Sequence, residues 1–522
     1  MSKGLDLILC LFRIFFYPQF FLKMCTKSIH LFGLFILLNC ILNSFIYGQR
    51  ILEVGPGKTY SNPALAARAA IPGDTILIYP ASYSGPFFIE NLKGTPAKWI
   101  FMRGTDAARV IFSGGSESMH FTDLQYVHLS NFTVTGQTGN GMNMDDGGTF
   151  ESTAKKVVLE NIFFRDMAAS GNNDMLKLSG LDSFEILNCH FENGSTGGSG
   201  IDMVGCHYGN IRQCRFVKQG SNSIQAKGGS SNLHLEKNFF INGGQRSLNL
   251  GGSTGLAFFR PAGANYEARD ILVSGNIFEG SVTPIAYVGC RNVQVVNNTI
   301  YHPERWIMRI LQESADTSFF QSCAYNVFSN NIVVVNNSLS TDVNIGPNTL
   351  PSSFKFANNL WYNDANASWR GPQLPVVESM GLVQRNPLFV QDGGINYGIG
   401  TSSPAFKAGL KQAIVFNDYR SRPYRNPPSI GAMEVPVQTF TKEIISDNQP
   451  TFIYPNPFQE EIYFSENMNG KTIYLFHASG MQVWKMESVN SGEKVSLKFL
   501  PEGIYFLKIE GEEGVFKLVK LN

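Results

Sequence analysis

This sequence has few charged residues and few cysteines that could pair, and each scarcity excludes some functions or kinds of site. Charged residues make up 16% of the 522 residues, and the formal net charge is +1. Such a balance lacks the basic surface that nucleic acid requires, so we expect no nucleic-acid partner. Eight cysteines are present, but three of them (Cys10, Cys25 and Cys40) precede residue 48. The remaining five cannot all pair and contain no CxxC spacing, which predicts buried free thiols instead of disulfides or a cysteine metal site.

A short apolar segment recurs between about residues 127 and 361, and its copies show no helical period. Its copies lie roughly 22–38 residues apart, a spacing typical of one coil of a solenoid. They read LSNFTV (129–134), LENIFF (159–164), ILNCHF (186–191), IRQCRF (211–216), LEKNFF (235–240), VSGNIF (273–278), VVNNTI (295–300), FSNNIV (328–333) and FANNLW (356–361). The repeat of strands with Gly and Asn corners predicts a parallel β-helix, which is a scaffold suited to binding long polymers.

The fourth position of the repeat is asparagine in its last five copies. These residues are Asn238, Asn276, Asn298, Asn331 and Asn359. Successive coils of a β-helix stack about 4.8 Å apart, so like residues come to lie on like residues. We therefore predict an internal ladder of asparagine amides, with Cys189 and Cys214 stacked in the same column.

A second strand recurs between these copies, and its alternation separates inward from outward side chains. The inward positions are Met142, Leu176, Ile201, Ile224, Leu248, Ile285 and Met308. The next positions are predicted to face solvent in one column: Asn143, Lys177, Asp202, Gln225, Asn249, Ala286 and Arg309. Two residues further on lies a second outward column: Asp145, Ser179, Val204, Lys227, Gly251, Val288 and Leu311. We interpret this polar stripe as a binding groove; the alternative is an ordinary solvated face.

The chain is predicted to contain four parts. Residues 1–48 hold an apolar run after a short basic start and read as a signal or targeting region, with a retained membrane anchor as the alternative. Residues 49–435 form the β-helix, whose N-terminal cap includes a short helix at Pro63–Ala70. Ile71–Gly85 resembles the first coils of right-handed parallel β-helix proteins, and residues 386–435 resemble the region after their last coil. Residues 436–449 read as a linker, and residues 450–522 as a small β-sandwich.

The last part carries a specific resemblance. YPNPF (454–458), a glycine-containing hairpin, LPEGIYFLKIE (500–510) and a terminal lysine-rich strand resemble the C-terminal sorting domain of the type IX secretion system. The resemblance implies a secreted or cell-surface protein, exported across the outer membrane by that machinery in a Bacteroidetes-type bacterium. The fold we predict is thus all-β: a right-handed single-stranded parallel β-helix followed by a small β-sandwich. We expect it to be a monomer.

Two insertions supply candidate functional residues next to the polar stripe, because long loops on a rigid scaffold concentrate binding groups. The first insertion, Gly251–Asp270, and the strand before it offer Arg246, Arg260, Tyr266, Glu267 and Arg269. The second, His302–Phe320, offers His302, Trp306 and Arg309. Arginine binds carboxylates bidentately, and aromatic rings stack on sugars. The alternative is that both insertions have only a structural role and that their charged residues form surface ion pairs.

The pattern resembles β-helix polysaccharide lyases of the alginate lyase and chondroitinase B group. That resemblance implies a lysine base near a strand end, and Lys227 in IQAKGGSSN (224–232) matches it. The acidic calcium ligands of the group correspond to Ser223 and Gln225 here, and its arginine one coil later corresponds to Gly251. No cofactor is therefore certain; calcium stays open, and the metal is unknown.

We accordingly predict an enzyme that cleaves an acidic polysaccharide by β-elimination. Arg246, Arg260 or Arg309 would neutralise the uronate carboxylate, Lys227 would be the base, with its pKa lowered by nearby guanidinium groups, and Tyr266 or His302 would be the acid. Substrate would also contact Asn143, Lys177, Asp202, Gln225, Asn249, Glu267, Arg269 and Trp306. Two alternatives remain: a glycoside hydrolase that uses Asp145, Asp146, Asp174 or Asp202, and a non-catalytic glycan-binding surface protein or adhesin.

Overall fold

The computed structural model describes residues 50–148, 153–436, 453–464, 469–477, 482–490, 492–510 and 515–521. The chain divides between Val435 and Pro436 into two compact units. The predicted targeting region lies outside the described residues, as does all of the predicted linker except Pro436. No helix of the described residues is long and apolar enough to cross a membrane.

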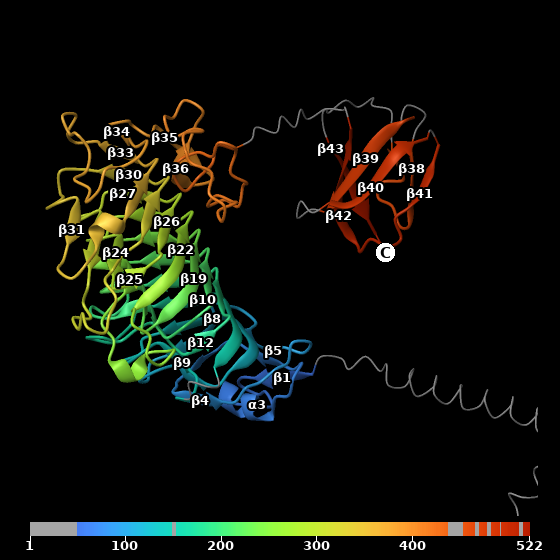
Figure 1. Cartoon of the computed structure of the whole chain (residues 1–522). Coiled ribbons are helices and arrows are strands. Elements are labelled where there is room, and N and C mark those ends of the chain that lie inside the picture. The colour runs from blue at the N-terminus through green and yellow to red at the C-terminus, as the bar shows by residue number, and fades with distance from the viewer. Residues whose placement is uncertain are drawn as a thin grey trace, which may run out of the picture. The chain divides into compact units, whose positions relative to one another are not determined.

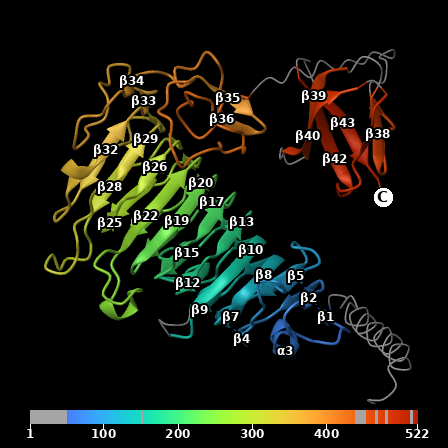
Figure 2. The ribbon, with the colours of Figure 1, turned by 45° about the vertical axis from the view of Figure 1, so that its right-hand side comes forward.

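The first unit is a stack of coils whose strands pair in parallel (Figures 1 and 2). One sheet, called sheet B here, has ten strands, one from each successive coil. In spatial order they are β4 (Phe87–Glu90), β7 (Met119–Thr122), β9 (Met142–Asp145), β11 (Leu176–Ser179), β15 (Ser199–Val204), β18 (Asn222–Lys227), β21 (Arg246–Gly251), β24 (Ile285–Val288), β28 (Met308–Leu311) and β31 (Val343–Ile345).

The other sheet, sheet A, has 24 strands in two columns. The first column contains β1 (Ile51–Val54), β2 (Thr75–Ile78), β5 (Ile100–Gly104), β8 (Gln125–Thr135), β10 (Ala154–Arg165), β13 (Glu185–Leu187), β16 (Asn210–Arg212), β19 (Ser230–Glu236), β22 (Ala268–Ser274), β26 (Gln294–Val296), β29 (Val327–Ser329) and β32 (Lys355–Ala357). The second contains β3 (Ala81–Tyr83), β6 (Val110–Ser113), β14 (His190–Glu192), β17 (Arg215–Val217), β20 (Phe239–Ile241), β23 (Ile277–Glu279), β27 (Thr299–Tyr301), β30 (Ile332–Val335), β33 (Leu360–Asn363) and β34 (Leu382–Val383). Strands β8 and β10 belong to both columns, and β12 (Leu181–Asp182) and β25 (Cys290–Arg291) are short additions.

Stacked like residues fill the space between the sheets. Five phenylalanines (Phe164, Phe191, Phe216, Phe240 and Phe278) form a continuous stack with ring centroids 4.7–5.0 Å apart. The seven residues predicted to point inward from sheet B are all fully buried, so that prediction is confirmed. Helix α3 (Pro63–Ala69) packs against this core through Ala66 and ends one residue before the predicted boundary.

The predicted asparagine ladder is confirmed. In each step, the backbone N–H and the side-chain amide of one asparagine donate to the side-chain oxygen of the next, at 2.8–3.1 Å from Asn238 to Asn359. The last member, Asn359, donates to Glu378, whose pKa is raised by burial. The five cysteines of the described residues are free and buried, as expected.

Beyond the last coils, the chain turns back over the outer face of sheet A. The hairpin β35 (Phe389–Asp392) and β36 (Ile395–Ile399) is antiparallel. It packs with the residues that follow it against Phe239, Ile277 and Ile332. The short 3₁₀ turns η2 (Leu256–Phe258) and η3 (Pro351–Ser353) lie in loops.

The second unit is a small antiparallel β domain, as predicted. One sheet contains β37 (Ile453–Tyr454), β38 (Glu461–Phe464) and β41 (Lys494–Ser496), and the other contains β40 (Gln482–Val489), β39 (Lys471–His477), β42 (Gly503–Ile509) and β43 (Val515–Lys520). Residues of both sheets, such as Ile462 and Leu475, share one buried core.

Candidate functional site

The register of sheet B aligns the predicted columns. Asn143, Lys177, Asp202, Gln225, Asn249, Ala286 and Arg309 are paired in that order on successive strands, and the column runs from Phe88 and His120 to Asn344. The expectation that all of them face solvent is wrong in part. Asp202 is 1% exposed, Asn249 is 3% exposed and Ala286 is fully buried. Asp202 is paired with two lysines, Asn249 is bonded to Arg246, and Ala286 packs with Leu311.

Two lysines share the carboxylate of Asp202 in the middle of sheet B. Lys227 Nζ lies 3.2 Å from Asp202 Oδ1, and Lys177 Nζ donates to Asp202 Oδ2. Lys177 Nζ also lies 3.6 Å from Asp174 Oδ2. The charged group in contact with Lys227 is therefore a carboxylate, whereas Arg246 and Arg260, which were expected near it, pair with Glu313 and Asp182. We call Asp174, Lys177, Asp202 and Lys227 the lysine–aspartate cluster.

Burial and charge act in opposite directions on this cluster. Burial and the charge of Asp202 raise the pKa of Asp174 to about 6, although Lys177 partly offsets them. Burial alone would lower the pKa of Lys177, but the carboxylates of Asp202 and Asp174 outweigh it and raise the pKa. Lys177 is accordingly an ammonium ion at neutral pH, whereas Asp174 exchanges its proton near pH 6.

The raised pKa of Asp174 predicts a pH dependence of stability that Asp174→Asn removes. The folded protein holds this proton up to about pH 6, whereas the unfolded chain loses it near the ordinary value of 3.8. Stability from this group is complete below the lower value and falls as the pH rises through the upper one. In urea unfolding between about pH 4 and pH 8, wild type should lose stability relative to the variant. Glu90→Gln, at an exposed carboxylate of β4, is the control; parallel curves for Asp174→Asn and wild type would contradict the assignment.

Three arginines gather where β21 and β28 begin. Arg246 donates to Asn249 Oδ1 at 2.9 Å and to Glu313 Oε1 at 2.6 Å. Arg309 donates to Asn344 Oδ1 at 2.9 Å. The guanidinium groups of Arg305 and Arg309 lie 4.3 and 4.6 Å from the Trp306 ring centroid. Burial lowers the pKa of Arg309, and the charge of Arg246 lowers it further. We call Arg246, Arg305, Trp306 and Arg309 the arginine cluster.

The first insertion forms a wall along the edge of sheet B where its strands end. The guanidinium group of Arg260 donates to both carboxylate oxygens of Asp182 at 2.7 Å, and this contact holds the loop in place. Figures 1 and 2 both show this yellow-green loop near β9 and β12. Glu267 is fully buried and accepts hydrogen bonds from Gly228 and Thr254.

Gln225 borders the lysine–aspartate cluster, where its Oε1 accepts from Lys227 Nζ at 3.5 Å, whereas Tyr266, Arg269 and His302 have other partners. Tyr266 is 7% exposed among Phe259, Ala264 and Phe320, and burial raises its pKa. The Arg269 guanidinium lies 4.5 Å from the Tyr266 ring centroid. His302 follows β27 of sheet A, where its Nε2 lies 2.7 Å from Asp364 Oδ2.

On the first strands of sheet B, the predicted residue Asp145 joins two residues that the sequence reasoning missed, His120 and Glu117. His120 Nε2 lies 2.6 Å from Asp145 Oδ2, and its Nδ1 lies 3.3 Å from Glu117 Oε1. Burial alone would lower the pKa of His120, but the Asp145 hydrogen bond and the Glu117 charge raise it. The exposed ring of Phe88 lies beside the imidazole, with centroids 5.7 Å apart. The sequence does contain a signal for this group, which is a pair of polar residues three positions apart. Glu117 and His120 form one such pair, and Asn140 and Asn143 form the corresponding pair one coil later.

The site does not fit a calcium ion. Among the described residues, no group of three or more His, Cys, Asp or Glu side chains is placed to hold a metal. Lysine ammonium groups face the oxygens that would be ligands, because Asp202 contacts both Lys177 and Lys227.

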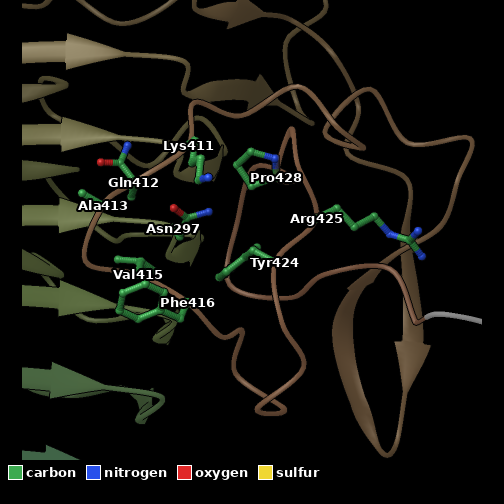
Figure 3. A pocket seen from close by; sticks show the side chains of 9 residues that line it. All are labelled: Asn297, Lys411, Gln412, Ala413, Val415, Phe416, Tyr424, Arg425 and Pro428. Atoms are coloured by element: carbon green, nitrogen blue, oxygen red, sulfur yellow. The ribbon is translucent and has the colours of Figure 1, made fainter. Parts of the chain in front are cut away.

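A separate cavity of about 350 Å³ lies between Asn297, which connects β26 and β27 of sheet A, and the returning chain (Figure 3). Asn297, Lys411, Phe416, Tyr424 and Arg425 are among its lining residues. Asn297 donates to Ser429 O and Tyr424 donates to Gly431 O, so these two groups hold the returning segment in place.

Comparison with known proteins gives two family matches. Residues 104–300 match the model of the right handed beta helix region, and residues 452–521 match that of the secretion system C-terminal sorting domain. The chain is a right-handed parallel β-helix protein with a C-terminal sorting domain. The sorting domain assigns this β-helix protein to type IX export, to the cell surface or the outside of the cell.

Solved structures similar to this β-helix protein include carbohydrate-active enzymes. Pectate lyase Pel9A shares 16% identity over 76% of this chain and 98% of its own, with a TM-score of 0.47. An alginate lyase from Paenibacillus sp. strain FPU-7 shares 17% over 64% and 99%, with a TM-score of 0.34. A lacto-N-biosidase from Eubacterium ramulus shares 11% over 64% and 68%, with a TM-score of 0.43. Likenesses of this size carry no information about activity. No curated protein matches the sequence.

Proposed function

We propose that this exported β-helix protein binds an acidic polysaccharide along sheet B and cleaves it by β-elimination. The excess of positive charge in the arginine cluster carries the proposal. Arg246, Arg305 and Arg309 lie close enough for Arg246 and Arg305 to lower the pKa of Arg309, and a single carboxylate, Glu313, offsets them. Such like charges are stabilised by an anionic ligand, and guanidinium groups bind carboxylates bidentately. Trp306 adds an aromatic face on which a sugar ring can stack.

The lysine–aspartate cluster supplies the proton transfers. Lys227 takes the proton from C5 of the uronate at its Nζ, which Asp202 holds in position. The C5–H electron pair forms the C4=C5 double bond, and the C4–O4 bond breaks. Lys177, an ammonium ion held on the other oxygen of Asp202, donates a proton to the departing O4. Lys177 takes the role first proposed for Tyr266 or His302, because both of those side chains have other partners away from Lys227.

Arg309→Ala is expected to weaken substrate binding more than it lowers turnover. A hydrogen bond to a charged group contributes about 1.5–3 kcal/mol, so kcat/KM should fall about 10–100-fold, mainly through KM. Arg309→Lys should recover part of the loss because it keeps the charge. Initial rates over a range of polymer concentrations measure the effect, with Arg215→Ala on β17 of sheet A as the matched control. An unchanged KM for Arg309→Ala would contradict the assignment.

A glycoside hydrolase is the second candidate, and the pKa of Asp174 favours it. A carboxyl group with a pKa of about 6 can act as a general acid, and Asp202 on the next strand could act as its partner carboxylate.

The two mechanisms differ in their products. A hydrolase yields new reducing ends without an unsaturated sugar, and its rate falls as the pH rises above about 6. A lyase yields an unsaturated uronate that absorbs in the ultraviolet. Asp174 Oδ1 already accepts from Ser199 N at 2.8 Å, and its side chain is 4% exposed, so β-elimination ranks first.

A further inference from the structure

The face of sheet B is open over its first strands and covered at β24, the eighth in spatial order. Phe88 on β4 is 54% exposed, and the outward side chains of β7, β9, β11 and β18 are half-buried. On β24, by contrast, Ala286 and Val288 are fully buried although they point outward. They join Leu311 of β28 in an apolar cluster. A polymer that follows the open strands therefore stops at β24, and only its terminal sugar reaches the arginine cluster, to which Arg246 contributes from β21 and Arg309 from β28.

Two segments cause this closure. Arg246 stands at the first position of β21, whereas Glu313 follows the last residue of β28, and their side chains meet at 2.6 Å. The ion pair thus connects the start of β21 to the segment that follows β28. The chain after β28 is fixed there, because Ser314 donates to the buried Glu267 of the first insertion, and Gln312 Oε1 accepts from Cys323 N at 2.9 Å.

We infer that the groove is closed at one end and accepts a polysaccharide by its chain end, so that cleavage is exolytic. This inference rests on the proposed function. Lys227 lies on β18, one strand before β21, and one inter-strand step is about 4.8 Å. The scissile bond therefore lies within one or two sugars of the closed end, and the product is a mono- or disaccharide. The strands from β4 to β18 hold the rest of the polymer.

Binding stoichiometry tests the inference separately from catalysis. The non-cleaving variant Lys227→Ala is titrated calorimetrically with short and long fractions of alginate, pectin and glycosaminoglycans. A closed groove binds one protein molecule per chain end, so the number bound per chain stays the same for both lengths. A number that rises in proportion to chain length overturns the exolytic inference and leaves the proposed function standing. Absence of binding to every acidic polymer overturns both.

Product length gives a second test with wild type. Short products should appear from the first minutes while the remaining polymer keeps its size, and a mixture of long fragments would overturn the inference. Glu313→Ala removes the ion pair with Arg246 and should shift the products toward longer fragments. Glu304→Ala removes an exposed carboxylate from the connection before β28 and serves as the control. Unchanged product lengths for Glu313→Ala would contradict closure by the ion pair.

Discussion

Replacing Lys227 by alanine is expected to lower kcat by about 10²–10⁴-fold, the range that a positioned general base contributes. The fold should survive, because Asp202 keeps Lys177 as its ion partner and no buried carboxylate is left unpaired. Lys227→Arg should be nearly as inactive, since a guanidinium stays protonated and cannot take up the C5 proton. Rates of formation of ultraviolet-absorbing product measure the effect, and circular dichroism verifies the fold.

Two comparisons make the Lys227 result specific. Lys355→Ala removes an exposed lysine from β32 of sheet A and should leave the rate unchanged. Lys177→Ala removes the proposed acid and should lower the rate, with a smaller loss on substrates that carry a good leaving group. Full activity of Lys227→Ala on a polymer that wild type cleaves would remove Lys227 from the mechanism.

The largest loss of stability is expected from Asn298→Ala, in the middle of the asparagine ladder. Asn298 is fully buried, accepts from the backbone and side chain of Asn276, and donates to Asn331 and to Val273 O. The truncation leaves several buried polar groups unpaired at about 1–3 kcal/mol each, so unfolding should become easier by at least about 3 kcal/mol. Urea unfolding of the wild-type and variant proteins measures the difference.

A control separates the ladder from asparagine in general. Asn337→Ala changes an exposed side chain and should shift stability by less than about 0.5 kcal/mol. Asn298→Asp should destabilise the protein further, because it places a carboxylate against the Asn331 oxygen. If Asn298→Ala and Asn337→Ala were equally stable, the ladder would not be a stabilising element.

Strand register was the most predictable feature, because a period of two and a repeat of one coil determine which residues stack. The inward positions, the asparagine ladder and the order of both outward columns follow from aligned copies of the repeat. The burial of each column residue could not be predicted from the aligned repeat, because it depends on segments outside the repeat. Ala286 packs in an apolar cluster with Leu311 of β28, and Asp202 pairs with lysines from the strands on either side.

The partners of the charged side chains were the least predictable feature. Arg260 reaches back 78 residues to Asp182, and nothing in the sequence of either segment indicates that pairing. The cluster around His120, however, could have been found. Aligning the residue three positions before each column member brings together Glu117, Asn140, Asp174, Asn222 and Arg246, and hydrogen bonds or ion pairs join these residues to the column.

Ultraviolet absorbance of the reaction products tests the central claim most directly. The chain from Gln49 to Val435 is mixed with alginate, pectins and glycosaminoglycans, and absorbance is followed at the band of the unsaturated uronate. Cleavage by β-elimination predicts a rise on at least one of these acidic polymers, which Lys227→Ala abolishes. A flat trace on every polymer contradicts the account: with new reducing ends it indicates a hydrolase, and without them a glycan-binding surface protein.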